Sequence, residues 1–418
     1  MSFRFIHTAD LHLDAPLRAM AFRDGELARE IGTASRTAFT RIIDLCISEG
    51  VAFLLIAGDL WDGEYSSTKT PRFLKQELLR LHRSGISCFI IRGNHDALAR
   101  RTGELDAPDD TTVFGARAST AEIEVNGHHI AIHGLSFRES QASESLLPRY
   151  PAPKSGAFNI GMMHTSLSGS PGHDNYAPCP PAALMAHGYN YWALGHIHRR
   201  AEHNGAATIV MPGIPQGRDI GEAGCCSVTL VSVADDNSLT LEQRVVAPLR
   251  FERAMVDCNG ISDWADLLTA LQRAIEGAAR DRLPDEQLVI RPVLHGNTWQ
   301  AWRIARDYDK LTEEVRAFAG DAGIWIDKLE IQTDHGDGHS PVSDLPDDLI
   351  RILHDDLPDD PGLIAAITLA AQELANALPA EMRGLLGQSE AEQAEICRDL
   401  LAQGTPAILS ALAAELAD

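Results

Sequence analysis

The chain has 418 residues, of which 44% are hydrophobic and 23% are charged, and its formal net charge is −23. This length exceeds what one hydrophobic core usually organises, so two or three domains are expected, and the composition excludes a chain that is disordered throughout. Taken alone, the negative charge argues against nucleic acid as a partner, because phosphate binding usually needs a basic surface.

The negative charge is concentrated at the C-terminal end of the chain. Residues 335–418 contain sixteen acidic and three basic residues, so they carry −13 of the total and leave −10 on the first 334 residues. Two bound dications would offset part of that remainder locally. The net charge is therefore weak evidence about what enters a site in the first part of the chain.

Cysteine usage and hydropathy indicate a cytoplasmic protein. The seven cysteines are scattered without a C-x-x-C pair, which disfavours a disulfide framework or a cysteine zinc site and fits a reducing compartment. The N-terminus enters a strand pattern directly, without the apolar region of a signal peptide. The most apolar late stretch, residues 363–378, is interrupted by polar residues, so we expect no membrane span.

Strand-like and helix-like segments alternate from the N-terminus to about residue 246. The first five are strand, helix, strand, helix and strand, at 3–7, 33–49, 51–57, 74–81 and 86–91. This order predicts right-handed crossovers and a mainly parallel sheet. Further strands follow at 121–125 and 128–133, around the hairpin signal Asn126-Gly127, then at 158–163, 189–194, 208–211, 227–233 and 239–246. We predict an α/β fold, a two-sheet sandwich over residues 1–247 with ligands on the loops at one edge.

A different pattern begins at Pro248. Strands at 253–259, 287–294 and 324–331 alternate with helices at 261–282 and 308–319, which predicts a small α/β domain over residues 250–333. A Gly-, Asp- and His-rich stretch at 335–341 is typical of a linker. Residues 342–418 then show only short helical segments, at 349–353, 363–378, 390–401 and 408–416.

Five short polar clusters occur in the first half of the chain, most of them directly after an apolar run. They are Asp10-Leu11-His12, Gly58-Asp59, Gly93-Asn94-His95-Asp96, His164 and Gly195-His196-Ile197-His198. Strand ends are where an α/β sheet presents its chemistry. Carboxylate, imidazole and amide oxygen together suit a pair of divalent cations such as Mn, Fe or Zn better than they suit Mg alone.

Two neighbouring metal ions need a ligand that both can share. A carboxylate on a tight turn can bridge them, and Asp59 after Gly58 fits that role. Residues two apart on an extended segment face the same side, as Asp10 and His12 would. We therefore predict one ion held by Asp10, His12, Asp59 and His198, and a second held by Asp59, Asn94, His164 and His196.

Such a pair of ions points to hydrolysis of phosphate esters. Residual positive charge would bind an anionic ester, and the pKa of a bridging water would fall from ~15.7 toward ~7. His95 lies beside a ligand and is placed to protonate the leaving oxygen or to stabilise the charged transition state, while Asp96 could hold the His95 ring in position. Most of the clusters are weak signals alone, and Gly93-Asn94-His95-Asp96 after an apolar strand is a stronger one, so the prediction depends on all five occurring in this order.

Together these motifs resemble the calcineurin-like metallophosphoesterase superfamily, over about residues 3–211. Within it the chain is similar to SbcD-type DNA repair exonucleases, especially the YhaO-like branch, in residues 9–16, 57–63, 194–198 and 212–218. The resemblance implies a DNA exonuclease with two divalent metal ions, Mn foremost and Fe, Zn or Mg as alternatives. Archaeal and eukaryotic relatives have a histidine three residues after the bridging aspartate, where this chain has Asp62.

The domain order extends the resemblance. Such nucleases carry a small capping domain that helps to bind DNA, then a helical tail that docks on the coiled coil of an SbcC-like ATPase. The resemblance thus implies a capping role for residues 250–333, a partner-docking role for 342–418, and a homodimer. Among basic residues near the motifs, Arg218, Arg199 and Arg100 are candidates for gripping the phosphates of DNA.

Two other functions stay open at this stage. The first is a metallophosphodiesterase acting on nucleotides, cyclic nucleotides or phosphoproteins, which the first domain alone cannot distinguish from a nuclease but which does not need the C-terminal third. The second is a non-catalytic scaffold on the same fold. Scaffolds of that kind usually lose metal ligands, and none is missing from this chain.

Overall fold

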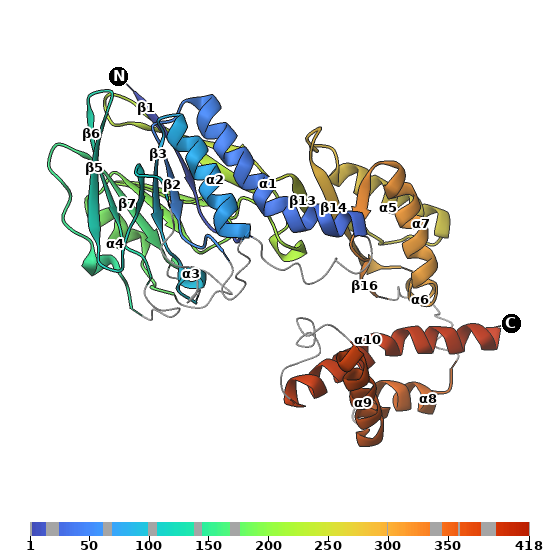
Figure 1. Cartoon of the computed structure of the whole chain (residues 1–418). Helices are drawn as coiled ribbons and strands as arrows, with labels where there is room; N and C mark the ends of the chain where they lie inside the picture. The colour runs from blue at the N-terminus through green and yellow to red at the C-terminus, as the bar shows by residue number, and fades with distance from the viewer. Residues whose placement is uncertain are drawn as a thin grey trace. The chain divides into compact units, whose positions relative to one another are not determined.

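The computed structural model describes residues 2–13, 25–61, 69–98, 107–137, 144–167, 176–298, 300–334, 345–357, 360–377 and 390–417. The chain divides into two compact units (Figure 1). The first comprises Met1–Phe251 with Leu283–Gln287, and the second Glu252–Arg282 with Leu288–Asp418. Among the described residues, no helix combines the length and the apolar character that crossing a membrane requires.

The described part of the first unit contains two six-stranded sheets. The first has the spatial order β12 (Leu239–Val245), β11 (Ser227–Val233), β1 (Phe3–Thr8), β2 (Phe53–Ala57), β3 (Ser87–Ile91) and β4 (Thr111–Val113). The second has the order β5 (Ser119–Val125), β6 (His128–Gly134), β7 (Phe158–His164), β8 (Tyr191–Gly195), β10 (Thr208–Met211) and β9 (Ala201–Asn204). Strands β1, β2, β3 and β4 are parallel to one another in the first sheet. In the second sheet the parallel strands are β6, β7, β8 and β10.

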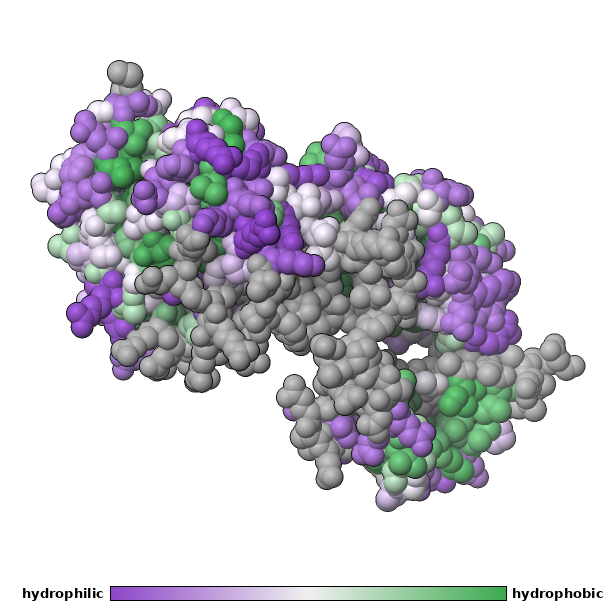
Figure 2. Space-filling view, viewed as in Figure 1, coloured by the Kyte–Doolittle hydropathy of each residue, from purple (hydrophilic) through white to green (hydrophobic). Residues whose placement is uncertain are grey.

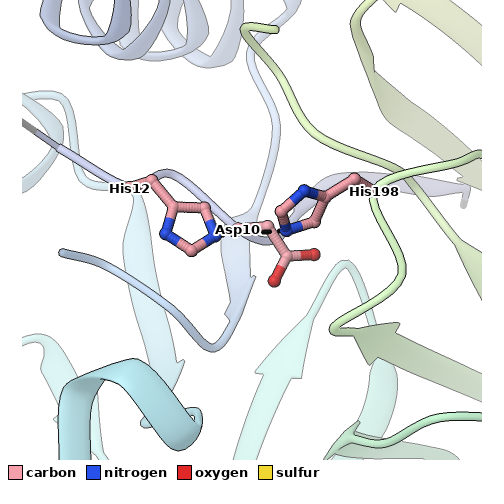
Figure 3. Close-up of side chains that lie close together, drawn as sticks. All are labelled: Asp10, His12 and His198. Carbon is pink, nitrogen blue, oxygen red and sulfur yellow. Dashed lines mark hydrogen bonds between the residues drawn. The ribbon is translucent and has the colours of Figure 1, made fainter. Parts of the chain in front are cut away.

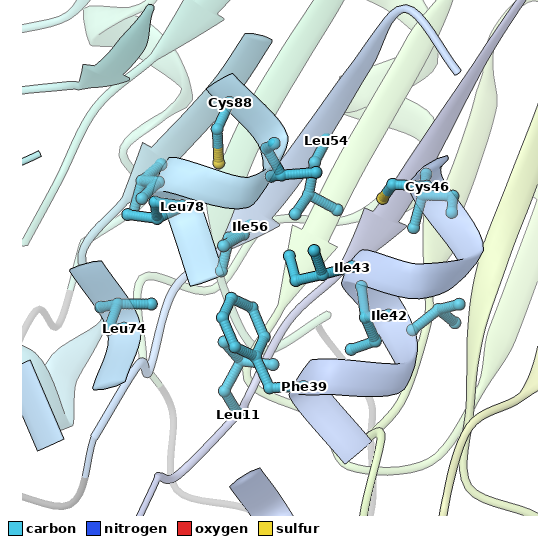
Figure 4. Packing of buried hydrophobic residues seen from close by; sticks show 14 of the residues in the cluster. Leu11, Phe39, Ile42, Ile43, Cys46, Leu54, Ile56, Leu74, Leu78 and Cys88 are labelled. Atoms are coloured by element: carbon cyan, nitrogen blue, oxygen red, sulfur yellow. The ribbon is translucent and has the colours of Figure 1, made fainter. Parts of the chain in front are cut away.

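Hydrophobic residues cover both faces of the first sheet. On the outer face, α1 (Gly25–Glu49) presents Phe39, Ile42, Ile43 and Cys46 at helical spacing, and all four are fully buried with the apolar side of α2 (Lys69–Arg83) in one cluster (Figure 4). On the inner face, aromatic rings fill the space between the two sheets, with Phe5 and Phe53 stacked at 4.9 Å. Burial on both faces explains why these strands are continuous apolar runs in the sequence.

The predicted α/β sandwich is confirmed. Asn126 and Gly127 have φ values of 52° and 82°, as a two-residue hairpin turn requires, and they join β5 to β6. The strands β4 and β9 and the short helix α4 (Pro181–Ala186) were not predicted. They have only three to six residues, too few for a period in hydrophobicity to emerge.

The small sheet of the second unit has the order β13 (Leu249–Asp257), β14 (Gln287–Asn297) and β15 (Ile324–Ile326), with β16 (Glu330–Asp334) also paired to β14. Helices α5 (Trp264–Ala278), α6 (Ala301–Arg306) and α7 (Tyr308–Asp321) accompany it. The single strand predicted at 324–331 is interrupted. Its register on β14 shifts by one residue there, where Asp327 accepts a hydrogen bond from Arg291 Nε at 2.7 Å.

The C-terminal segment is helical, as predicted. It comprises α8 (Asp347–Arg351), a π-helical turn (Ile352–Asp356), α9 (Pro361–Ala377) and α10 (Glu390–Ala417). The two helices expected at 390–401 and 408–416 form one, since α10 continues through Gly404-Thr405-Pro406, and the Thr405 hydroxyl donates to the Leu401 carbonyl at 2.9 Å. The linker expected at 335–341 lies outside the described residues.

His7 on β1 makes a buried polar connection between the two sheets of the first unit. Its Nε2 donates to the carbonyl of Leu194 on β8 at 3.0 Å, and its Nδ1 accepts from the hydroxyl of Tyr191 at 2.9 Å. Burial lowers the pKa of His7 to about 3, although the bond to Leu194 opposes this shift. The neutral ring therefore holds the end of β8 against the end of β1.

The low pKa of His7 predicts a loss of stability in mild acid. The unfolded chain takes up a proton below about pH 6.5 and the folded chain does not, so the free energy of unfolding falls by about 1.4 kcal/mol per pH unit from there toward pH 3. Between pH 7 and pH 5 the native protein should lose about 2 kcal/mol more than His7→Gln, measured by urea unfolding with a chelator present. Equal losses in the two proteins would contradict this account.

Candidate metal centre

The five polar clusters converge at one edge of the first unit, at the C-terminal ends of strands from both sheets. Asp10 and His12 follow β1, Asp59 follows β2, and Asn94 begins α3 (Asn94–Leu98) after β3. From the second sheet come His164, which ends β7, and the two histidines after β8, His196 and His198. The loops thus bring together side chains up to 188 positions apart in the sequence.

The backbone at the site is strained. Asp10, His12, Asp59 and His196 have positive φ values of 53°, 40°, 51° and 104°, in a region that non-glycine residues rarely adopt. Such conformations cost about 1–3 kcal/mol each and persist where the surrounding structure imposes them. Here the N–H of Asp10 donates to the Gly58 carbonyl at 3.0 Å, and the N–H of His12 to the Asp59 carbonyl at 3.1 Å. The first two loops therefore hold each other in place.

The first group of candidate ligands consists of Asp10, His12 and His198, whose ligand atoms lie within 4.8 Å of one another. The rings of His12 and His198 point toward each other beside the Asp10 carboxylate, with their Nε2 atoms 3.2 Å apart (Figure 3). His198 Nδ1 lies 2.6 Å from Glu222 Oε1 and donates its proton there. With the proton on Nδ1, Nε2 of His198 is an acceptor that faces His12.

The second group consists of Asp59, His164 and His196, again within 4.8 Å. His164 is fully buried and its Nδ1 donates to the Ala57 carbonyl at 2.9 Å, which leaves its Nε2 as an acceptor. That nitrogen faces Asn94 Oδ1 at 3.0 Å and Asp59 Oδ2 at 3.3 Å. Three acceptor atoms converge, and only a proton or a metal cation between them makes the contact favourable.

Asp59 lies between the two groups. Its Oδ2 is 3.3 Å from Nε2 of His164 and 3.9 Å from Nε2 of His12, so one carboxylate oxygen is within reach of both. Its Oδ1 accepts a hydrogen bond from the N–H of His95 at 3.0 Å, which fixes the orientation of the group. This is the placement expected of a bridging ligand.

The acidic and histidine side chains of the site shift one another's pKa values. Burial lowers the pKa of His164, but the negative charges of Asp59 and Asp10 outweigh it and raise the pKa to about 9. Burial by itself raises the pKa of Asp59, yet His164 and His12 hold it well below its usual range. Burial also raises the pKa of Asp10. A proton on His164 thus takes the place that a metal cation would fill, and the donor set fits two divalent ions.

His95 and Asp96 both lie at the site. The His95 ring packs edge-on against His12, with centroids 5.0 Å apart. Asp96 was expected to hold the His95 ring, but its carboxylate accepts hydrogen bonds from the N–H groups of Leu60 at 2.9 Å, Trp61 at 3.3 Å and Gly93 at 2.9 Å. Asp96 therefore ties the loop after β2 to the loop after β3, because those buried N–H groups need an acceptor.

The three arginines proposed for phosphate binding are placed differently from one another. Arg218 forms an ion pair with Glu222, with Nη2 2.7 Å from Oε1. Arg199 is exposed next to His198. Arg100, like Asp62, lies outside the described residues. Sequence reasoning overlooked Glu222, which lies 24 residues from His198 and in no recognisable motif.

Comparison with known proteins agrees with this geometry. A model of the calcineurin-like phosphoesterase family matches residues 3–200, and a model of the middle domain of the metallophosphoesterase YhaO matches residues 251–334. The uncharacterized metallophosphoesterase YhaO of Bacillus subtilis is 32% identical over 343 residues, covering 79% of this chain and 82% of that protein. The chain belongs to the YhaO family of calcineurin-like metallophosphoesterases.

More distant relatives match about half of the chain, and the match spans about half of their own length. The DNA double-strand break repair protein Mre11 of Methanocaldococcus jannaschii is 29% identical over 209 residues, covering 47% of this chain and 51% of that protein. A solved structure, a dimetal phosphatase from Danio rerio, is 13% identical with a TM-score of 0.37, covering 59% of this chain and 96% of that chain. As a YhaO family member, the protein is a metal-dependent phosphoester hydrolase of a family that uses two divalent ions.

Close packing explains the glycines of two motifs. Gly58, with φ of 98°, lies so near His164 that an added Cβ would overlap its Nδ1. At Gly93 an added Cβ would overlap Oδ1 of Asp59. A side chain at either position would therefore displace a candidate ligand. The glycines are part of the metal-binding geometry, although they donate no ligand atom.

Gly93→Ala should weaken metal binding. The new methyl group must push the Asp59 carboxylate away, so we expect Mn²⁺ affinity to fall by about tenfold or more, together with about 1–3 kcal/mol of stability. Isothermal titration of the metal-stripped protein with Mn²⁺ measures the first effect and urea unfolding the second. Gly115→Ala is the matched control, because nothing lies within 4 Å of the added atom. Equal affinities in the two variants would refute the packing argument.

Proposed function

We propose that the protein is a two-metal DNA nuclease that hydrolyses phosphodiester bonds at DNA ends and acts in DNA repair. The observation that carries the proposal is the convergence of candidate ligands from loops of both sheets. Asp59 Oδ2 lies 3.3 Å from His164 Nε2 and 3.9 Å from His12 Nε2, and Asn94 Oδ1 lies 3.0 Å from His164 Nε2. The resemblance to SbcD-type nucleases and the similarity to proteins described as Mre11 support DNA as the substrate. The family assignment supports phosphoester hydrolysis in general.

The residues of the site divide into holding and protonating roles. When bound, two divalent ions, Mn²⁺ foremost, supply positive charge for the phosphate and a nucleophilic water of lowered pKa. Asp10, His12 and His198 would hold one ion, and Asn94, His164 and His196 the other, with Asp59 shared. His95 is partly buried on the same edge and is placed to give a proton to the leaving oxygen. Arg199, exposed beside His198, is a candidate for contacting the DNA backbone.

We also propose the C-terminal helices as the docking site for the coiled coil of an SbcC-like ATPase. Large apolar side chains are exposed there, with Leu369 59%, Leu374 55%, Leu400 51% and Ile408 48% accessible. Hydrophobic residues gather on the visible face of these helices (Figure 2). The segment is also strongly acidic, which suits contact with a protein better than contact with DNA.

Asp59→Asn tests the central assignment. An amide cannot supply the shared negative charge, so we expect Mn²⁺-dependent degradation of linear DNA to fall by about 10³-fold or more. Degradation of labelled duplex and single-stranded DNA should be compared with hydrolysis of cyclic nucleotides. Full nuclease activity in the variant would remove Asp59 from the mechanism. Rapid turnover of a cyclic nucleotide by the native protein without action on DNA would favour the nucleotide phosphodiesterase instead.

His95→Gln tests the protonating role separately. The variant should retain both Mn²⁺ ions, because His95 is not among the candidate ligands, while the rate of cleavage falls by about 10²–10⁴-fold. Metal content after dialysis and single-turnover cleavage are the two measurements. Loss of an ion from the variant would show that His95 is a ligand rather than an acid.

A further inference from the structure

Glu222 connects the metal centre to a part of the chain that no motif covers. It ends the short turn η2 (Ile220–Glu222), and its side chain is only 13% exposed. The N–H of Gly221 donates to Oδ1 of Asp219 at 2.7 Å and so shapes this turn. The carboxylate is thereby directed at Nδ1 of His198, 2.6 Å away.

Arg218 holds this carboxylate from the other side. Its Nη2 donates to Oε1 of Glu222 at 2.7 Å, and its backbone N–H donates to Oε2 at 2.7 Å. Nη2 also lies 3.3 Å from His198 Nδ1, but the shorter contact of that nitrogen with Glu222 assigns the ring proton to the imidazole–carboxylate bond. The arrangement is a chain of charge-assisted hydrogen bonds from Arg218 through Glu222 to His198.

The loop that carries both residues is anchored at its start. The amide nitrogen of Gln216 donates to the Leu249 carbonyl at 2.8 Å, and its oxygen accepts from the Leu249 N–H at 3.4 Å. Gln216 is buried, with 4% of its surface exposed. The loop therefore has a fixed base on the first residue of β13, and Glu222 is presented by a supported turn.

The histidine ligands of the two candidate ions have different hydrogen-bond partners. His198, in the first group, donates to a charged carboxylate, whereas His164, in the second, donates to the neutral carbonyl of Ala57. A carboxylate partner fixes the tautomer of a ligating histidine and makes its other nitrogen a stronger donor to a metal. A backbone carbonyl fixes the tautomer with less effect on basicity.

We propose that Glu222 is a positioning residue that tightens only the ion held by Asp10, His12 and His198, and that Arg218 serves to hold Glu222 rather than to bind substrate. This inference rests on the two-metal centre of the proposed function. It makes the two metal sites of one protein differ in affinity, with the difference set by a residue that touches neither substrate nor metal.

The test is titration of the metal-stripped full chain with Mn²⁺ in the native protein, Glu222→Ala and Glu222→Gln. We expect one of two binding steps to weaken by about 10–100-fold in Glu222→Ala while the other keeps its affinity. Glu222→Gln should lie between, because its amide oxygen can accept the same hydrogen bond without the charge. Glu202→Gln is the control, since Glu202 forms a comparable ion pair with Arg200 that does not touch a candidate ligand.

A second readout separates positioning from a general structural effect. In histidine ¹⁵N spectra of the metal-free protein, the native chain should show His198 protonated at Nδ1, and Glu222→Ala should lose this preference while the other candidate ligands keep their signals. Equal weakening of both Mn²⁺ steps, no weakening of either, or an unchanged His198 tautomer would overturn the inference. Absence of DNA cleavage by the native protein would refute the proposed nuclease and leave these measurements unaffected.

Discussion

The site depends on nitrogen and oxygen atoms that converge at 3.0 to 3.9 Å and need a proton or a metal cation among them. Nε2 of His164 faces the oxygens of Asn94 and Asp59, because its other nitrogen is committed to a backbone carbonyl. Such contacts repel unless a positive charge lies among them. In the metal-free protein the nearby carboxylates of Asp59 and Asp10 raise the pKa of His164, so its ring holds a proton at this place.

The two-sheet frame maintains this unfavourable convergence. Polar links cross between the sheets next to the ligands: His7 to the Leu194 carbonyl, His164 to the Ala57 carbonyl, and the N–H of His196 to the Asp10 carboxylate at 3.0 Å. The links of His7 and His164 are buried, so breaking either leaves an unsatisfied polar group in a medium of low dielectric. Packing of the aromatic core between the sheets stabilises the fold and so offsets the backbone strain of the loops.

The charged side chains at the centre favour the binding of metal cations. Asp10 and Asp59 supply negative charge, whereas the charges of Glu222 and Arg218 offset each other in an ion pair. Burial raises the pKa of Glu222, but hydrogen bonds from His198 and Arg218 lower it to about 2, so this carboxylate stays charged. Two bound cations would add the positive charge that attracts an anionic phosphate ester to this centre.

The sequence by itself determined the α/β sandwich, the hairpin at Asn126-Gly127 and the set of residues that meet at one edge. These follow from local periodicity and from the rule that parallel strands end on the same side of a sheet. Only the tertiary structure decided the partners of individual side chains. Asp96 accepts hydrogen bonds from the backbone N–H groups of Leu60 and Gly93, and Glu222 binds His198 24 residues away. These partners depend on which polar groups from separate segments lie together once the loops are packed.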